Sequence, residues 1–140
     1  MSVPVVVYVL TALAAVVVVL TRLRMRGGQG AGRFHVGRRL LDVHTVCGTL
    51  AVVIWTVFLI APEDSPAGSS SVGIVGLGFF WITTVAGLLI LVRWLPSHGK
   101  HASAAQQDTW SEGPGLSVLA HVGMLVGVVV FTFAYLTNLV

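Results

Sequence analysis

The sequence predicts an all-α integral membrane protein, an up-down bundle of four transmembrane helices with both termini on the non-cytoplasmic side. The first observation is composition: 56% of the 140 residues are hydrophobic, only 9% are charged, and the mean hydropathy is +0.93. A soluble fold of this size cannot bury so much apolar surface, so lipid must be the solvent. The other two observations are four long apolar runs and the one-sided placement of the basic residues.

The four apolar runs cover residues 3–20, 40–61, 72–95 and 116–140. At about 1.5 Å per helical residue, each run is long enough to cross a hydrocarbon core of about 30 Å. The connector 22–39 is rich in Arg and Gly, the connector 62–71 carries Glu63 and Asp64, and the connector 96–115 is polar. The sequence shows no internal repeat and has no room for a separate soluble domain, so residues 1–140 are expected to form a single transmembrane domain.

All eight Lys and Arg residues fall in or beside the first and third connectors, while the second connector has only acidic charges. The positive-inside rule therefore places connectors 22–39 and 96–115 in the cytoplasm. The positive charge follows the first run instead of preceding it, so we expect an uncleaved anchor and not a secretory signal peptide. We expect a multi-pass protein of a bacterial-type plasma membrane. The basic residues that raise the pI to about 9.8 flank the membrane spans, where membrane topology accounts for them. We therefore expect no nucleic-acid binding.

Two histidines, His44 and His121, each lie about five residues inside an apolar run. Both runs begin at the cytoplasmic side of the membrane and cross it in the same direction. Each ring therefore lies about 7 Å from the cytoplasmic edge of the membrane, so the two rings can lie at the same depth. Ionisable residues at membrane depth are rare and tend to be functional. This pair is therefore the main candidate site.

The helical neighbours of the histidines also carry information. At 100° per residue, the face of His44 holds small residues first and aromatic residues further out: Cys47, Gly48, Ala51, Trp55 and Phe58. This order suits a flat macrocycle. The face of His121 is expected to hold Met124, Leu125, Val128, Thr132 and Tyr135, with Gly123, Gly127 and Ala134 on a separate face.

These patterns favour axial ligation of one haem b by His44 and His121, with Cys47, Gly48 and Ala51 shaping the slot. Neutral imidazole is a normal ligand of haem iron, and ligation removes the cost of leaving two polar rings in hydrocarbon. Two alternatives stay open. In the first, each ring forms a hydrogen bond to a nearby carbonyl, to Thr45, to Asp42 or to interfacial water. In the second, the pair has a proton-handling role, in which the rings take up and release protons.

The four-helix layout and the positions of His44 and His121 resemble the small b-type cytochrome membrane modules, such as the anchors of succinate dehydrogenase or hydrogenase and the four-histidine transmembrane cytochromes. The resemblance covers the layout and these two positions. It implies a haem b-binding electron-transfer subunit. Cytochromes with two haems use a second histidine pair toward the opposite face, which is absent here, so the resemblance implies at most one haem.

A second hypothesis is a non-catalytic accessory or scaffold subunit that binds a membrane-protein partner or a second copy of itself. Gly123 and Gly127 form a GxxxG pattern, which lets helix backbones approach closely in lipid. Small residues also recur in the run 72–95, where we expect them to allow tight packing: Gly73, Gly76, Gly78, Thr83 and Gly87.

Other features carry less functional information. His98 and His101, with His35, Asp108 and Glu112, are expected to lie in solvated connectors and not in a metal site. Asp42 is expected to pair with Arg38 or Arg39, or to orient a neighbouring helix. The single cysteine, Cys47, excludes an internal disulfide. There is no phosphate loop, HExxH or GxSxG motif, so neither nucleotide nor hydrolytic chemistry is expected.

Overall fold

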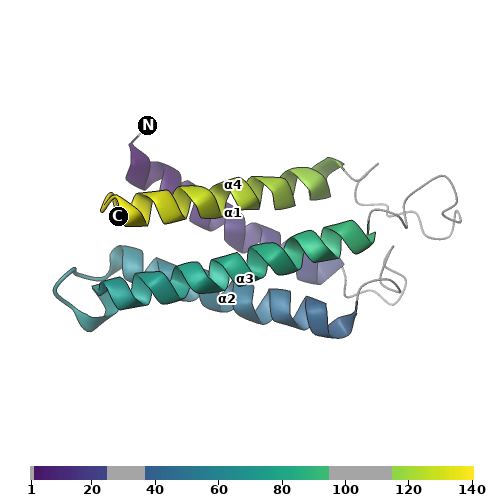
Figure 1. Cartoon of the computed structure of the whole chain (residues 1–140), viewed down its shortest axis with the longest axis horizontal. Helices are drawn as coiled ribbons and strands as arrows, with labels where there is room; N and C mark the ends of the chain where they lie inside the picture. The colour runs from purple at the N-terminus through teal and green to yellow at the C-terminus, as the bar shows by residue number, and fades with distance from the viewer. Residues whose placement is uncertain (1, 25–36, 95–114) are drawn as a thin grey trace, which may run out of the picture.

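A computed structural model describes residues 2–24, 37–94 and 115–140 of the chain. These residues are helical apart from short turns and ends (Figure 1), and the elements are α1 (Val3–Arg24), α2 (Arg38–Ile60), η1 (Pro66–Gly68), α3 (Ser70–Trp94) and α4 (Gly115–Leu136). Within the described residues, the four α-helices are long and apolar enough to cross a membrane. The all-α class, the four-helix bundle and its capacity to span a membrane are confirmed.

Two helix ends differ from the sequence prediction by four residues, and the others by at most two. Helix α1 continues past residue 20 to Arg24, because Thr21, Arg22 and Leu23 keep the helical pattern. Helix α4 ends at Leu136 and not at residue 140. Asn138 adopts a φ of 51°, and the N–H of Leu139 donates to the carbonyl oxygen of Ala134 at 2.9 Å. A left-handed residue followed by such a bond is a common way for a helix to end.

The four helices form a ring in which each helix packs on the next and α1 closes on α4, so α2 and α4 face each other across the diagonal. The α2–α3 contact is the most extensive of these contacts. Tyr8 donates to the carbonyl of Leu59 at 3.0 Å, which joins the start of α1 to the end of α2. Tyr135 donates to the carbonyl of Ser70 at 2.9 Å, which joins the end of α4 to the start of α3. These bonds fix both pairs as antiparallel.

A tight turn connects α2 to α3, at the same end of the bundle as both termini (Figure 1). The hydroxyl oxygen of Ser65 accepts from the N–H of Gly68 at 3.1 Å and caps η1. A Cβ on Gly68 would collide with the carbonyl oxygen of Pro62. The turn therefore needs a glycine at this position.

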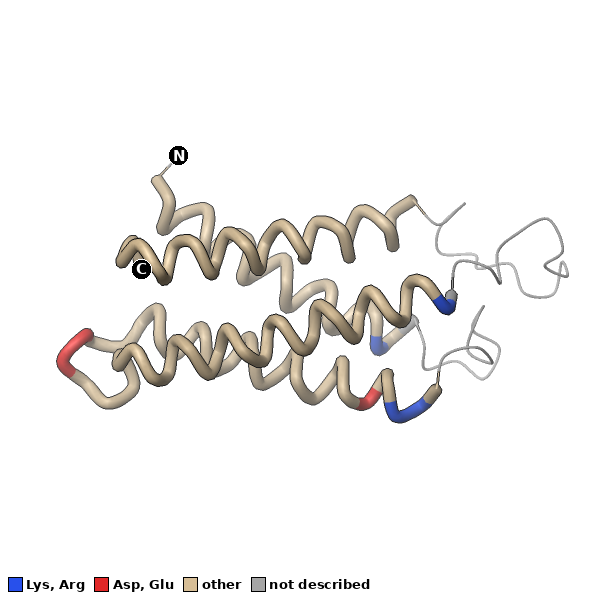
Figure 2. The backbone as a smooth tube through the Cα atoms, in the orientation of Figure 1, with Lys and Arg blue, Asp and Glu red and all other residues tan. Residues whose placement is uncertain are grey.

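The basic residues lie at one end of the bundle, as Figure 2 shows for the described residues. Glu63 and Asp64 lie in the α2–α3 turn, and the arginines of the helices lie at the opposite end. Asp42 bonds to Arg22 of α1 at 2.8 Å, which agrees with the alternative that it orients a neighbouring helix and not with a pair to Arg38 or Arg39. The pair therefore joins α1 to α2, because the antiparallel packing places the end of α1 beside the start of α2.

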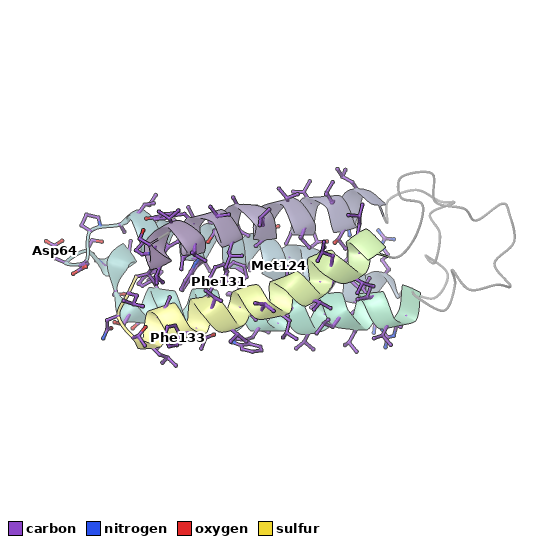
Figure 3. All side chains as sticks on the ribbon, turned by 90° about the horizontal axis from the view of Figure 1, so that it is seen from above. Asp64, Met124, Phe131 and Phe133 are labelled. Atoms are coloured by element: carbon purple, nitrogen blue, oxygen red, sulfur yellow. The ribbon has the colours of Figure 1, made fainter. Side chains whose placement is uncertain are left out.

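The interior of the half nearer the termini is aromatic. Trp55, Phe80 and Phe131 are fully or almost fully buried, and the ring of Phe131 lies 5.4 Å from Trp55 and 5.0 Å from Phe80 between centroids. Figure 3 shows the contrast on α4 between Phe131, which points into the bundle, and Phe133, which points outward and is 59% exposed. This aromatic cluster gives the half nearer the termini a dense core.

The buried face of α4 is broader than the predicted one. Gly127 and Ala134 lie about 120–140° around the helix from His121, on the separate face that was expected, and all three are buried. Leu125, expected beside His121, is 36% exposed. Helix α4 packs against both α1 and α3, so its buried arc is broad and His121 lies at the edge of that arc.

The glycines of α3 do not share one environment. Gly73 lies against the rings of Tyr135 and Phe58, and Gly76 lies against the backbone of Trp55, so both allow close packing as expected. Gly78 is different, because nothing lies within 4 Å of the position its Cβ would occupy. The expectation of tight packing is therefore wrong for Gly78, which faces away from the bundle.

Candidate two-histidine site

The structure brings His44 and His121 together inside the bundle. Their ring centroids are 6.2 Å apart and their planes are inclined by 42°. His44 is 2% exposed and His121 is 9% exposed. Each histidine lies six residues after the first residue of its helix, Arg38 in α2 and Gly115 in α4. Because α2 and α4 are diagonal partners, residues at equal depth can meet across the interior.

The backbone of α4 orients the ring of His121. Its Nδ1 lies 2.8 Å from the carbonyl oxygen of Ser117, one turn earlier in the helix. A carbonyl can only accept, so in the neutral ring Nδ1 carries the proton and Nε2 carries the basic lone pair. Histidines that bind a metal through one ring nitrogen commonly donate the N–H of the other to a carbonyl oxygen in this way.

The ring of His44 lacks such a partner on Nδ1, which is buried and has no hydrogen bond among the described residues. The neighbours that the sequence offered as partners are engaged elsewhere. Thr45 donates to the carbonyl of Leu41 at 2.8 Å, and Asp42 pairs with Arg22. A buried polar atom without a partner costs about 1–3 kcal/mol. Neither Thr45 nor Asp42 therefore satisfies Nδ1 of His44 among the described residues.

Helix α3 provides a third wall at Gly87. A Cβ on Gly87 would lie 2.8 Å from Cδ2 of His121 and 3.2 Å from Nε2 of His44. Both imidazoles therefore lie directly against the backbone of α3.

A cavity of about 20 Å³ adjoins the two rings. Side chains of α1 and α3, among them Ala14, Val18 and Thr84, line it together with Met124 of α4. The described residues around it include no charged side chain. Apolar clusters lie on both sides along the bundle axis: the aromatic cluster toward the termini, and Leu41, Ile90 and Leu91 toward the arginine end. The site is therefore small and of low polarity.

The residues predicted to shape a haem slot lie beside this cavity but do not line it. Gly48 is buried between α1 and α3, where its Cβ would lie 2.6 Å from Cγ2 of Val18 and 3.1 Å from Cγ2 of Thr83. Ala51 is fully buried against the aromatic cluster, and Cys47 is half-buried.

Sequence reasoning took Gly87 for a packing glycine and so missed its contact with both rings. The distance of Gly87 from the end of its helix could have indicated this contact. Gly87 lies seven residues before Trp94, the last residue of α3, which is close to the depth of the histidines.

Other candidate ligands do not join the pair. His98, His101, His35, Asp108 and Glu112 lie outside the described residues. Within residues 2–24, 37–94 and 115–140, no three His, Cys, Asp or Glu side chains gather into a metal-binding group.

Two imidazoles are a donor set that haem iron accepts, whereas the cavity is too small for the macrocycle. An imidazole nitrogen lies about 2 Å from a bound metal ion and about 1 Å from its own ring centre, so two rings on one ion have centres roughly 6 Å apart. The observed 6.2 Å agrees with that separation. The cavity of about 20 Å³, however, has room for little more than one water-sized group. A bound macrocycle requires the helices around the site to stand further apart.

Comparisons with protein families, with curated proteins and with solved structures found no match to this chain. Function is therefore inferred from the geometry of the histidine pair.

Proposed function

We propose that this chain is an electron-transfer subunit of a membrane complex that binds one haem b through His44 and His121. The main support is the convergence of two imidazoles, 6.2 Å apart, from diagonal helices inside the bundle. When bound, haem b supplies a one-electron redox couple. The carbonyl of Ser117 sets the tautomer of His121, and the apolar clusters on both sides keep water from the site.

The proposal requires α4 to move away from α2 at the histidine end when the site is filled. Side-chain hydrogen bonds join α4 to α3 in the other half of the bundle, from Tyr135 to Ser70 at 2.9 Å and from Trp81 to Thr132 at 3.2 Å. Helix α4 also packs less extensively on α3 than α2 does. The histidine end can therefore open while the end nearer the termini stays joined.

We also propose the orientation of the chain as a multi-pass protein in a bacterial-type plasma membrane. Connectors 22–39 and 96–115 are placed in the cytoplasm, and both termini face outward. The placement of the basic residues at one end of the bundle supports this orientation (Figure 2), since the positive-inside rule assigns arginine-rich ends to the cytoplasm. The histidine pair then lies in the cytoplasmic half of the membrane, nearer to a redox partner on that side.

A second candidate function is a non-catalytic accessory or scaffold subunit. Gly78 of α3 and Gly123 of α4 both face open space, since at either residue nothing lies within 4 Å of the position that a Cβ would occupy. Exposed glycines let the backbone of another membrane helix approach closely. A partner subunit or a second copy of this chain can use these surfaces whether or not haem is bound.

A visible absorption spectrum separates the two functions. Protein purified from cells with adequate haem supply should show a reducible b-type spectrum, and His44→Ala and His121→Ala should each abolish it because one axial ligand is lost. His98→Ala and His101→Ala are the matched controls and should leave the spectrum unchanged. A colourless wild-type protein contradicts haem binding and leaves the scaffold function.

A further inference from the structure

Gly87 of α3 is the place where a third helix meets both imidazoles. The positions of the surrounding atoms leave no room for a side chain, since a Cβ would lie 2.8 Å from Cδ2 of His121 and 3.2 Å from Nε2 of His44. Carbon atoms in favourable contact are about 3.5–4.0 Å apart. A methyl group at this position must therefore displace at least one ring or the helix itself.

Moving either ring aside disturbs the contacts that hold it. The hydrogen bond between His121 Nδ1 and the carbonyl of Ser117 at 2.8 Å fixes that ring against its own helix. His44 is 2% exposed and packs in the interior. Displacing His121 costs its hydrogen bond, and displacing α3 disturbs the extensive α2–α3 contact.

We infer that Gly87 is a positioning residue of the two-histidine site. Its missing side chain sets where the two imidazoles lie relative to each other, and so sets the geometry offered to a metal centre between them. The effect of Gly87 on ring positions follows from the contacts alone, whereas its effect on a bound group rests on the proposed haem function.

The same helix offers a matched control. Gly78 is nine residues away on α3, also within the candidate membrane span, and a Cβ there meets nothing within 4 Å. Gly78→Ala and Gly87→Ala make the same change in helix propensity and composition. A difference between them therefore reports the contact with the rings.

The first test is a double-mutant cycle on thermal stability in detergent. Gly87→Ala should unfold at least about 4 °C below Gly78→Ala, as expected for overpacking of an interior contact. In a His121→Ala background the nearest atom is gone, so the gap between the two glycine variants should shrink by at least half. If Gly87→Ala yields no folded protein, the double variant Gly87→Ala with His121→Ala should restore it.

Equal stability of Gly87→Ala and Gly78→Ala, or a gap unchanged by His121→Ala, overturns the inference. Failure of the double variant to restore folding also overturns it. These readouts need no haem, so a colourless wild-type protein with a positive cycle refutes the proposed function and leaves the positioning role of Gly87 intact.

The second test applies to protein that binds haem. Gly87→Ala should lose at least half of the haem content or shift the absorption maximum of the reduced form, while Gly78→Ala should match the wild type. Full haem content with an unchanged spectrum in Gly87→Ala shows that the ring positions do not depend on this glycine, and the inference then fails even though haem binding stands.

Discussion

Replacement of Gly48 tests whether the face of α2 that carries His44 is the interior face. Gly48 is enclosed from two sides: its Cβ would lie 2.6 Å from Cγ2 of Val18 on α1 and 3.1 Å from Cγ2 of Thr83 on α3. Relative to a contact distance of about 3.5–4.0 Å, the first overlap alone is about 1 Å. Leucine adds three further carbons, so Gly48→Leu should cost about 3 kcal/mol or more, at the upper end of overpacking effects.

Val52→Leu is the matched comparison, since Val52 is half-buried one turn further along α2 and the change adds one methylene. It should cost less than about 1.5 kcal/mol. Thermal unfolding in detergent, followed by circular dichroism, should place Gly48→Leu roughly 8 °C or more below Val52→Leu. Haem content measured on the same samples shows whether the loss extends to the site.

A rescue experiment sharpens the test. Val18→Ala removes the methyl groups nearest to Gly48, so Gly48→Ala should be less destabilising in that background than in the wild type. If Gly48→Leu is tolerated as well as Val52→Leu in both stability and haem content, the His44 face is turned to lipid. The two-histidine site then does not exist as described.

Two further predictions concern orientation and charge. In a Cys47→Ala background, single cysteines at Ser69 and Ser103 should react with a membrane-impermeant reagent from opposite sides of the membrane, because the first position lies in the acidic connector and the second in a basic one. Reaction of both from outside contradicts the proposed orientation. Asp42→Asn should lower stability by no more than about 1 kcal/mol, because the Arg22 and Asp42 side chains are 33% and 47% exposed and exposed ion pairs contribute little. A much larger loss in chemical or thermal unfolding means that the membrane environment strengthens this pair.

The helices were predictable because each one is marked by the length and hydropathy of its own stretch of sequence. Length and hydropathy mark the four spans, and the structure places them close to the expected residues. The interior face of α2 was also predictable, since Gly48, Ala51 and Trp55 are buried with His44 as the 100° arithmetic indicated. A single helix seen alone carries enough information for these conclusions.

Features that depend on which helices are neighbours were not predictable in this way. The burial of Gly127 and Ala134 was not predicted, because the buried arc of α4 is set by two neighbouring helices, α1 and α3. The partner of Asp42 was missed for the same reason, since Arg22 is 20 residues away in the chain. Gly87 belongs to a helix without a histidine, so its role emerges only when three helices are placed together.

The interior of the bundle is divided along its length, and this division bears on function. Toward the termini, Trp55, Phe80 and Phe131 form a dense aromatic core, and a tyrosine bond joins α4 to α3. In the other half, a small cavity of low polarity adjoins His44 and His121. Dense packing at one end of the bundle stabilises the fold, although the other end contains two polar imidazoles and a cavity. The proposed site therefore lies in the half of the bundle away from the aromatic core.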